Sequence, residues 1–141
     1  MVELETLKGS CLCKSVRYEV YAEPSQVANC HCTMCQKQHG APYGTYFSVR
    51  KSDFKYTTGE EKLISFNASS TIQRKFCSIC GSNIEWSGSP KYLDWVSITL
   101  STLDTSYNPK KIEDHFLENK VCWLKCDWRV SKLYYAKIIG R

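Results

Sequence analysis

The sequence predicts a mainly β protein built of short antiparallel strands. Three observations support this: apolar and polar residues alternate over short stretches, aromatic and β-branched residues dominate those stretches, and glycine or proline separates them. Helix signals are weak by comparison. The 141 residues suit one compact domain, so we expect residues 1–141 to form a single domain.

Strands are expected where this alternation is clearest. The ranges are 16–22, 43–50, 53–58, 62–67, 71–76, 82–87, 94–100 and 112–117. The strands on either side of Gly59 are expected to form one hairpin, and those on either side of residues 77–81 another. A short helix is expected over Thr33–His39, ended by Gly40 in the left-handed conformation. The tail 130–139 is compatible with a strand or a helix.

Nine cysteines are the most unusual feature of the composition. A secreted disulfide scaffold would explain so many, but the number is odd and the first residues lack the apolar segment of a secretory signal. The cysteines also lie in CxC and CxxC pairs, and the two residues of a CxC seldom form a disulfide with each other. We therefore predict a reducing, cytoplasmic compartment, where this pattern indicates metal or redox chemistry.

The charge distribution argues against two classes of partner. The formal net charge is +5, but the lysines and arginines are scattered, and no basic stripe indicates nucleic-acid binding. No apolar run approaches the length that crosses a bilayer. We expect neither nucleic acid nor a membrane as a partner, whereas a modest positive field favours a small anionic substrate.

Two cysteine pairs that are far apart in the sequence are spaced to share one metal ion. Cys77 and Cys80 form a CxxC knuckle followed by Gly81, and Cys11 and Cys13 form a tighter pair. Zinc prefers four tetrahedral donors, and a short loop usually presents two sulfurs. We predict that the two pairs converge on a closed, structural zinc site. A redox pair at Cys77 and Cys80 is the alternative, although no thioredoxin-like βαβ pattern surrounds them.

A second group of cysteines has three members within six residues. Cys30, Cys32 and Cys35 can all reach one metal ion and would leave its fourth position open. An open position distinguishes a catalytic zinc from a structural one, because water or substrate can enter it. His31 could complete the site, but we favour a supporting or packing role for it. The spacing of Cys122 and Cys126 could fit one helical face or a loose metal pair, but both lie among large apolar residues, and we interpret them as buried small hydrophobes.

Several motifs together resemble a known family. They are Gly9-Ser10-Cys11-Leu12-Cys13, Val16-Arg17-Tyr18, Cys30-His31-Cys32-Thr33-Met34-Cys35-Gln36-Lys37, Gly40-Ala41-Pro42 and Phe76-Cys77-Ser78-Ile79-Cys80-Gly81. In order and spacing they resemble the glutathione-dependent formaldehyde-activating enzyme family, also called the centromere-protein-V-like family. The resemblance runs from about Leu7 to about Trp128.

The resemblance implies a fold, two zinc ions and an activity. The fold is Mss4-like, a pair of antiparallel sheets with zinc at their edges. By the resemblance, the four cysteines of the outer pairs hold a structural ion and the CxCxxC cysteines hold a catalytic one. The activity is condensation of formaldehyde with glutathione to S-hydroxymethylglutathione, classed as a carbon–sulfur lyase reaction, so the expected partner is a small thiol such as a glutathione adduct.

Four residues near the CxCxxC motif are candidates for supporting roles in that chemistry. His39 or Tyr43 could donate a proton to the new hydroxyl, although a helix cap for His39 and packing for Tyr43 are the simpler interpretations. Gln36 and Lys37 could contact an anionic substrate or lie in a solvated loop.

Two non-enzymatic functions remain open on the sequence. In the first, both zinc ions are structural and the domain binds a protein, which exposed Trp123 and Trp128 would support. In the second, the three-cysteine group acts as a zinc reservoir or redox sensor, and mild peroxide would release zinc from that group alone.

Overall fold

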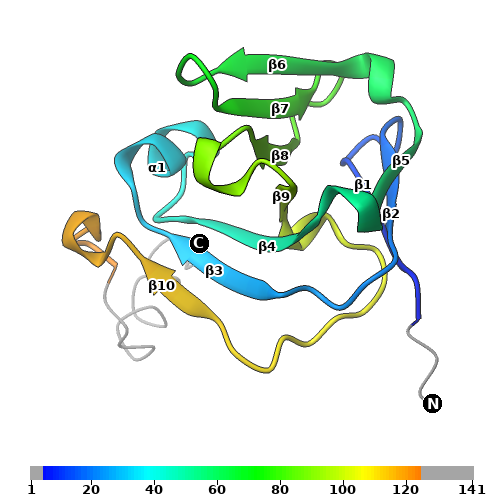
Figure 1. The fold of residues 1–141 in the computed structure, drawn as a ribbon. Coiled ribbons are helices and arrows are strands. Elements are labelled where there is room, and N and C mark those ends of the chain that lie inside the picture. Colours follow the sequence, from blue (N-terminus) through cyan, green and yellow to red (C-terminus); the bar gives the residue numbers. More distant parts are fainter. Residues whose placement is uncertain (1–4, 125–141) are drawn as a thin grey trace, which may run out of the picture.

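The computed structural model describes residues 5–124, in which ten strands form two sheets (Figure 1). The smaller sheet has the order β1-β2-β5, with β1 at Leu7–Ser10, β2 at Arg17–Val20 and β5 at Phe54–Thr58. The larger sheet has the order β10-β3-β4-β9-β8-β7-β6. Its strands in chain order are β3 Gln26–Cys30, β4 Gly44–Arg50, β6 Leu63–Asn67, β7 Gln73–Cys77, β8 Asn83–Ser87, β9 Trp95–Thr99 and β10 Glu113–His115. The predicted mainly β fold of short strands in two sheets is confirmed.

Alternating residues of both sheets form the core. In β2, buried Tyr18 and Val20 alternate with the more exposed Arg17 and Glu19. The fully buried side chains are Val16, Tyr18, Val20, Phe47, Val49, Ile84, Ile98, Cys11 and Cys77. Burying each large apolar side chain contributes about 1.5–3 kcal/mol to folding. Because Cys11 and Cys77 belong to this set, one cysteine cluster is joined directly to the core.

The helix α1 has the predicted bounds, Thr33–His39. Its N-cap is Cys32, whose sulfur accepts a hydrogen bond from the backbone N–H of Cys35. Gly40 ends the helix with φ of 57°, in the left-handed region where glycine is favoured. Figure 1 shows α1 on the side of the molecule away from the small sheet. Five short 3₁₀ turns complete the described elements: η1 Lys51–Asp53, η2 Glu60–Lys62, η3 Pro90–Tyr92, η4 Leu100–Thr102 and η5 Leu117–Asn119.

The strand pairings agree with the predicted ones only in part. The hairpin of β7 and β8 around residues 77–81 is confirmed. The predicted hairpin around Gly59 is wrong, because β5 pairs with β2 in the small sheet while β6 pairs with β7 in the large one. Local turn chemistry indicated the reversal of the chain but not the change of sheet. In addition, β10 pairs with β3 in parallel, so not all pairs are antiparallel as expected.

Gly59 is the point at which the chain passes from one sheet to the other, and it is sterically required there. Its φ is 76°, and a Cβ at this position would lie 2.0 Å from the backbone oxygen of Ser15. We expect Gly59→Ala to cost more than the roughly 1–3 kcal/mol of left-handed strain alone, because the Ser15 backbone would have to move.

Gly40→Ala is the matched control for this prediction, since its φ of 57° is also positive but nothing lies within 4 Å of its added Cβ. Urea denaturation of both variants measures the difference. Equal destabilisation would show that the contact with Ser15 does not constrain the crossing.

Among residues 5–124, no helix is long and apolar enough to cross a membrane. The tail 130–139 and Cys126 lie outside the described residues.

Candidate metal centres

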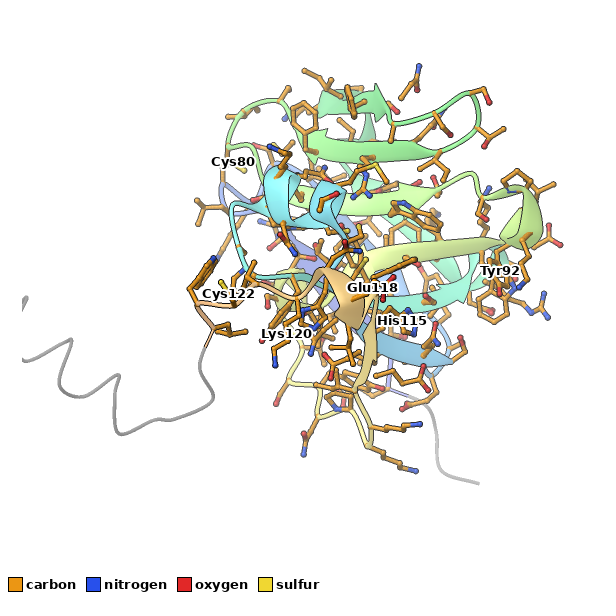
Figure 2. All side chains as sticks on the ribbon, turned by 90° about the vertical axis from the view of Figure 1, so that its left-hand side faces the viewer. Cys80, Tyr92, His115, Glu118, Lys120 and Cys122 are labelled. Atoms are coloured by element: carbon orange, nitrogen blue, oxygen red, sulfur yellow. The ribbon has the colours of Figure 1, made fainter. Side chains whose placement is uncertain are left out.

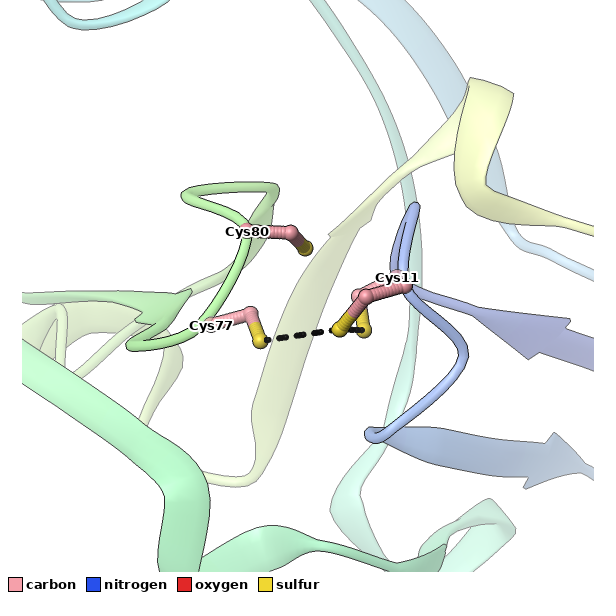
Figure 3. A group of neighbouring side chains, drawn as sticks. Cys11, Cys77 and Cys80 are labelled. Atoms are coloured by element: carbon pink, nitrogen blue, oxygen red, sulfur yellow. Dashed lines mark hydrogen bonds between the residues drawn. The ribbon is translucent and has the colours of Figure 1, made fainter.

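The four cysteines of the outer pairs come together, as the sequence predicts. Cys11 and Cys13 follow β1, Cys77 ends β7, and Cys80 lies in the turn before β8. Their sulfur atoms all lie within 4.8 Å of one another. Figure 3 shows the sulfurs of the two loops facing each other across a short gap. We call this set the four-sulfur cluster.

Backbone hydrogen bonds fix the two loops that form the four-sulfur cluster. The N–H of Cys11 donates to the Val16 carbonyl at 3.0 Å, and the N–H of Gly81 donates to the Cys77 carbonyl at 2.8 Å. Gly81 has φ of 76°, which lets the chain turn back directly after the CxxC. The N–H of Leu12 donates to Ser82 Oγ at 2.9 Å and so ties one loop to the other. The cluster therefore joins the β1–β2 pair to the β7–β8 hairpin.

The spacing within the four-sulfur cluster fits a tetrahedral zinc ion. Zn–S bonds of about 2.3 Å place the sulfurs of a tetrahedral site about 3.8 Å apart. The Cys11 and Cys13 sulfurs lie 3.5 Å apart, and the Cys13 and Cys77 sulfurs 3.8 Å apart. The eight cysteines among the described residues are all free thiols. The donor set and its spacing are those of a closed four-thiolate site.

Cys30, Cys32 and Cys35 form a second group, the three-sulfur cluster. Cys30 ends β3, Cys32 caps α1, and Cys35 lies in the first turn of that helix. Their sulfurs also lie within 4.8 Å of one another, and the cluster has no fourth metal-binding side chain among residues 5–124. The helix start brings three sulfurs of a six-residue segment together without help from a distant loop. Its donor set fits a soft divalent ion that keeps one position free.

In both clusters, a cysteine with a raised pKa lies beside one with a lowered pKa. In the three-sulfur cluster, hydrogen bonds from Cys30 and then from Arg74 lower the pKa of Cys35 to about 5, against the effect of burial. The hydrogen bond with Cys35 and burial raise the pKa of Cys30. In the four-sulfur cluster, burial raises the pKa of Cys11 to about 11. Metal binding by thiols requires their deprotonation, so a metal ion at either cluster would displace the protons that these sulfurs hold.

His31 points away from the three-sulfur cluster, which agrees with the supporting role predicted for it. The side chain is buried, and its Nε2 lies 2.8 Å from Oδ1 of Asp114 on β10. Its ring packs against Tyr43, with ring centroids 4.9 Å apart. The backbone N–H of His31 donates to the His115 carbonyl at 2.9 Å. His31 therefore attaches the CxCxxC segment to β10 and is not a member of the cluster.

Of the residues predicted for supporting roles, His39 is the one whose ring nitrogens both lie within hydrogen-bond distance of polar side chains. Its Nε2 is 2.6 Å from the hydroxyl of Tyr46, and its Nδ1 is 3.4 Å from Nδ2 of Asn83. Burial lowers the pKa of His39, which favours the neutral ring. Burial, and after it the negative charge of Cys35, raise the pKa of Tyr46, so this hydroxyl remains protonated beside the cluster.

Gln36 and Lys37 have different surroundings although they are adjacent. Gln36 Nε2 donates to the His31 carbonyl at 2.6 Å and to the Asn119 carbonyl at 2.8 Å, so it connects α1 to η5. Lys37 is exposed to solvent. Gln36 therefore has an architectural role, and of the two only Lys37 is free to meet an anion.

Arg74, on β7, is a neighbour of the three-sulfur cluster that sequence reasoning missed. Its Nη1 donates to the Cys35 sulfur at 3.5 Å and to Gln38 Oε1 at 2.8 Å. The residue is buried, with 4% of its surface exposed. The only signal in the sequence is a charged residue at an inward position of a predicted strand, three residues before Cys77.

Cys122 corrects one of the predictions made from the sequence. It was expected to be buried among its apolar neighbours, but it is exposed and belongs to neither cluster. Trp123 beside it is 64% exposed. Figure 2 shows Cys122 at the outside of the molecule, where the chain follows η5. Apolar neighbours lead to burial only where an element packs one face on the core, and this turn does not.

Comparison with known proteins assigns the family. A family model described as glutathione-dependent formaldehyde-activating enzyme matches residues 6–119, most of the chain. The chain belongs to this family. The match spans both cysteine clusters and every strand of the two sheets.

Individual relatives agree with the family assignment. A Halomonas elongata protein with the provisional name glutathione-dependent formaldehyde-activating enzyme is 29% identical over 140 residues, covering 92% of this chain and 87% of the relative. A Fusarium vanettenii protein with the same provisional name is 33% identical over 101 residues, covering 67% of this chain but only 54% of its own length. A crystal structure of a Rhodobacter sphaeroides protein matches with a TM-score of 0.62 at 22% identity, covering 76% of this chain and 98% of that one. This last likeness supports the fold.

Proposed function

We propose that this protein is a zinc-dependent carbon–sulfur lyase that forms or cleaves a glutathione–formaldehyde adduct or a related thiol adduct. The observation that carries the proposal is that the two clusters differ in their number of sulfur ligands. One offers four sulfurs and the other offers three, with no fourth metal-binding side chain among residues 5–124. A closed site stabilises a fold, whereas an open one admits a ligand. We further propose that residues 1–141 form one domain of this family, acting in the reducing cytoplasm.

The two clusters support the following ligand roles. Cys11, Cys13, Cys77 and Cys80 hold a structural zinc ion, and Cys30, Cys32 and Cys35 hold a catalytic one. A zinc ion held by Cys30, Cys32 and Cys35 would supply a positive charge that keeps the sulfur of a bound thiol ionised near neutral pH. The chain's own contribution is to hold three sulfurs on one side and leave the other side open.

The proposed reaction is redox-neutral. The thiol sulfur forms a bond to the carbon of formaldehyde, and the electron pair of the C=O π bond moves to the oxygen. That oxygen takes up one proton, which balances the one proton that the thiol lost. The product is a hydroxymethyl thioether, and the reverse sequence breaks the same carbon–sulfur bond.

His39 is better placed than Tyr43 to assist this proton transfer. The Tyr43 ring is occupied by its packing against His31. His39 is hydrogen bonded to Tyr46, whose pKa responds to the charge on Cys35. We propose that the His39–Tyr46 pair carries the proton between the cluster and solvent, since hydrogen-bonded ring nitrogens and hydroxyls suit general acid–base work.

The test is the rate at which formaldehyde exchanges between its hydrate and the glutathione adduct, followed by NMR exchange spectroscopy. We expect zinc-loaded protein at a small fraction of the substrate concentration to raise this rate above the spontaneous one. Protein stripped of metal, and an equal concentration of zinc salt, are the controls. Identical exchange rates with and without the loaded protein would refute the proposal. Acceleration with another small thiol but not with glutathione would retain the reaction class and change the substrate.

A second candidate function is a protein-binding module, and one observation favours it. Phe116, Leu117 and Trp123 are all exposed apolar residues near the end of the described chain. Such residues occur at interaction surfaces. A fourth protein ligand at the three-sulfur cluster would favour this function, and none is present there among residues 5–124. We therefore place the enzyme first.

A further inference from the structure

Arg74 is a buried positive charge without a carboxylate partner among residues 5–124. Its guanidinium is permanently charged, and the residue is 4% exposed. Burying an unpaired charge costs several kcal/mol, so a buried arginine normally faces a carboxylate. Among residues 5–124, no Asp or Glu lies within ion-pair distance of it. Its Nε also has no hydrogen-bond partner in that part of the chain.

The anionic neighbour of Arg74 is the three-sulfur cluster. Nη1 donates to the Cys35 sulfur at 3.5 Å. Its second contact, with Gln38 Oε1 at 2.8 Å, is to a neutral acceptor on the same helix and supplies no charge. Three thiolates and one divalent cation sum to a single negative charge, which the guanidinium balances. A thiolate in the fourth position would otherwise raise the negative charge to two in a partly buried site.

The four-sulfur cluster differs in having one exposed sulfur beside its two buried ones. Cys13 is exposed, so water can stabilise the negative charge of that site. Cys35, by contrast, is buried. At the buried Cys35 sulfur, the guanidinium of Arg74 supplies the positive partner that water cannot supply.

We propose that Arg74 is a positioning residue of the three-sulfur centre, where its fixed charge compensates the metal-bound thiolates and its hydrogen bond holds Cys35 in place. The inference rests on the proposed metal binding at that centre, but not on formaldehyde or glutathione as substrate. With this role for Arg74, β7 contributes to both centres. Arg74 contacts the three-sulfur cluster, and Cys77, three residues later, belongs to the four-sulfur cluster. The hairpin that closes the structural site thereby positions α1 at the open one.

Zinc affinity measured by competition with a chelator tests the proposal without any activity assay. Circular dichroism recorded in the same titration assigns the two ions, because removing zinc from the three-sulfur centre should leave the fold intact. We expect Arg74→Met to weaken that centre about 10–100-fold, the usual effect of losing a residue that orients a metal ligand. Arg74→Lys should recover most of the affinity. Arg50→Met, which removes an exposed positive charge that packs over Trp95 and is part of neither cluster, should bind zinc like the wild type.

Two outcomes of the chelator titration would overturn the inference, and they are distinguishable. If the wild type binds a single zinc per chain, the three-sulfur centre fails, and the proposed function fails with it. If the wild type binds two and Arg74→Met holds the second as tightly, only the role of Arg74 fails.

A second comparison covers the case in which Arg74→Met does not fold by itself. In a variant with serine at Cys30, Cys32 and Cys35, the guanidinium has no thiolate to balance. Adding Arg74→Met to that triple variant should raise its melting temperature, because an unpaired buried charge is removed. A quadruple variant that melts lower than the triple one, or does not fold, would show that Arg74 supports the fold regardless of the thiolates and would overturn the proposal.

Discussion

Replacing Cys80 with serine is expected to destabilise the protein far more than replacing Cys35. Structural zinc contributes about 10–16 kcal/mol in zinc-finger peptides. A whole domain is stable by only about 5–15 kcal/mol. Losing most of the zinc affinity at the four-sulfur cluster should therefore lower the melting temperature by more than about 10 °C. Cys35→Ser should cost about 1–3 kcal/mol, since the open centre is not needed to join the two sheets.

Burial alone predicts the opposite order, which makes the comparison informative. Cys35 is buried, whereas Cys80 is partly exposed. If packing decided the outcome, Cys35→Ser would be the more damaging change. Cys122→Ser is the control for the chemistry of the substitution, because Cys122 is exposed and outside both clusters. Thermal melts followed by circular dichroism, with zinc content measured in parallel, give the result. Equal melting temperatures for the Cys80 and Cys35 variants would contradict the division into structural and open sites.

The two cysteine clusters were predictable because cysteine spacing is a local property with a geometric consequence. A CxxC followed by Gly81 forms the same turn in many surroundings, and the left-handed φ of that glycine is what the turn requires. The helix was predictable for a similar reason, since Gly40 marks its end. Which cysteine pairs come together was predicted by counting sulfur donors, because four sulfurs complete a tetrahedral site and three do not.

Sheet membership and the surroundings of the clusters were not predictable in the same way. Gly59 marks a turn in either case, and the turn itself does not indicate that β5 pairs with β2 while β6 pairs with β7. The parallel pairing of β10 with β3 joins segments more than eighty residues apart. Arg74 became visible only when β7 was placed against α1, since its partner Cys35 lies 39 residues earlier. Long-range contacts of this kind leave no periodic signal in a single sequence.

Replacing Cys32 with serine should abolish the acceleration of adduct exchange while leaving the fold and the structural zinc intact. Cys32 is the N-cap of α1, and its sulfur accepts the Cys35 N–H at 3.3 Å. Serine is among the residues preferred at an N-cap, so the hydroxyl can take over this hydrogen bond. What the variant loses is one of three thiolates, and a two-thiolate site should hold zinc much less tightly. We expect one zinc per chain in place of two and a melting temperature within a few degrees of the wild type, about what 1 kcal/mol or less would give.

Cys32→Ala separates the two roles of this residue. Alanine removes both the thiolate and the N-cap. Relative to serine, it should therefore lower the free energy of unfolding by about 0.5–2 kcal/mol more. Both variants should be equally inactive in the exchange assay, because neither completes the three-sulfur centre. If Cys32→Ser retained wild-type exchange rates with only one zinc bound, the chemistry would not take place at this centre. If it kept both zinc ions and lost activity, the thiolate would be required for the charge of the site and not for holding the metal.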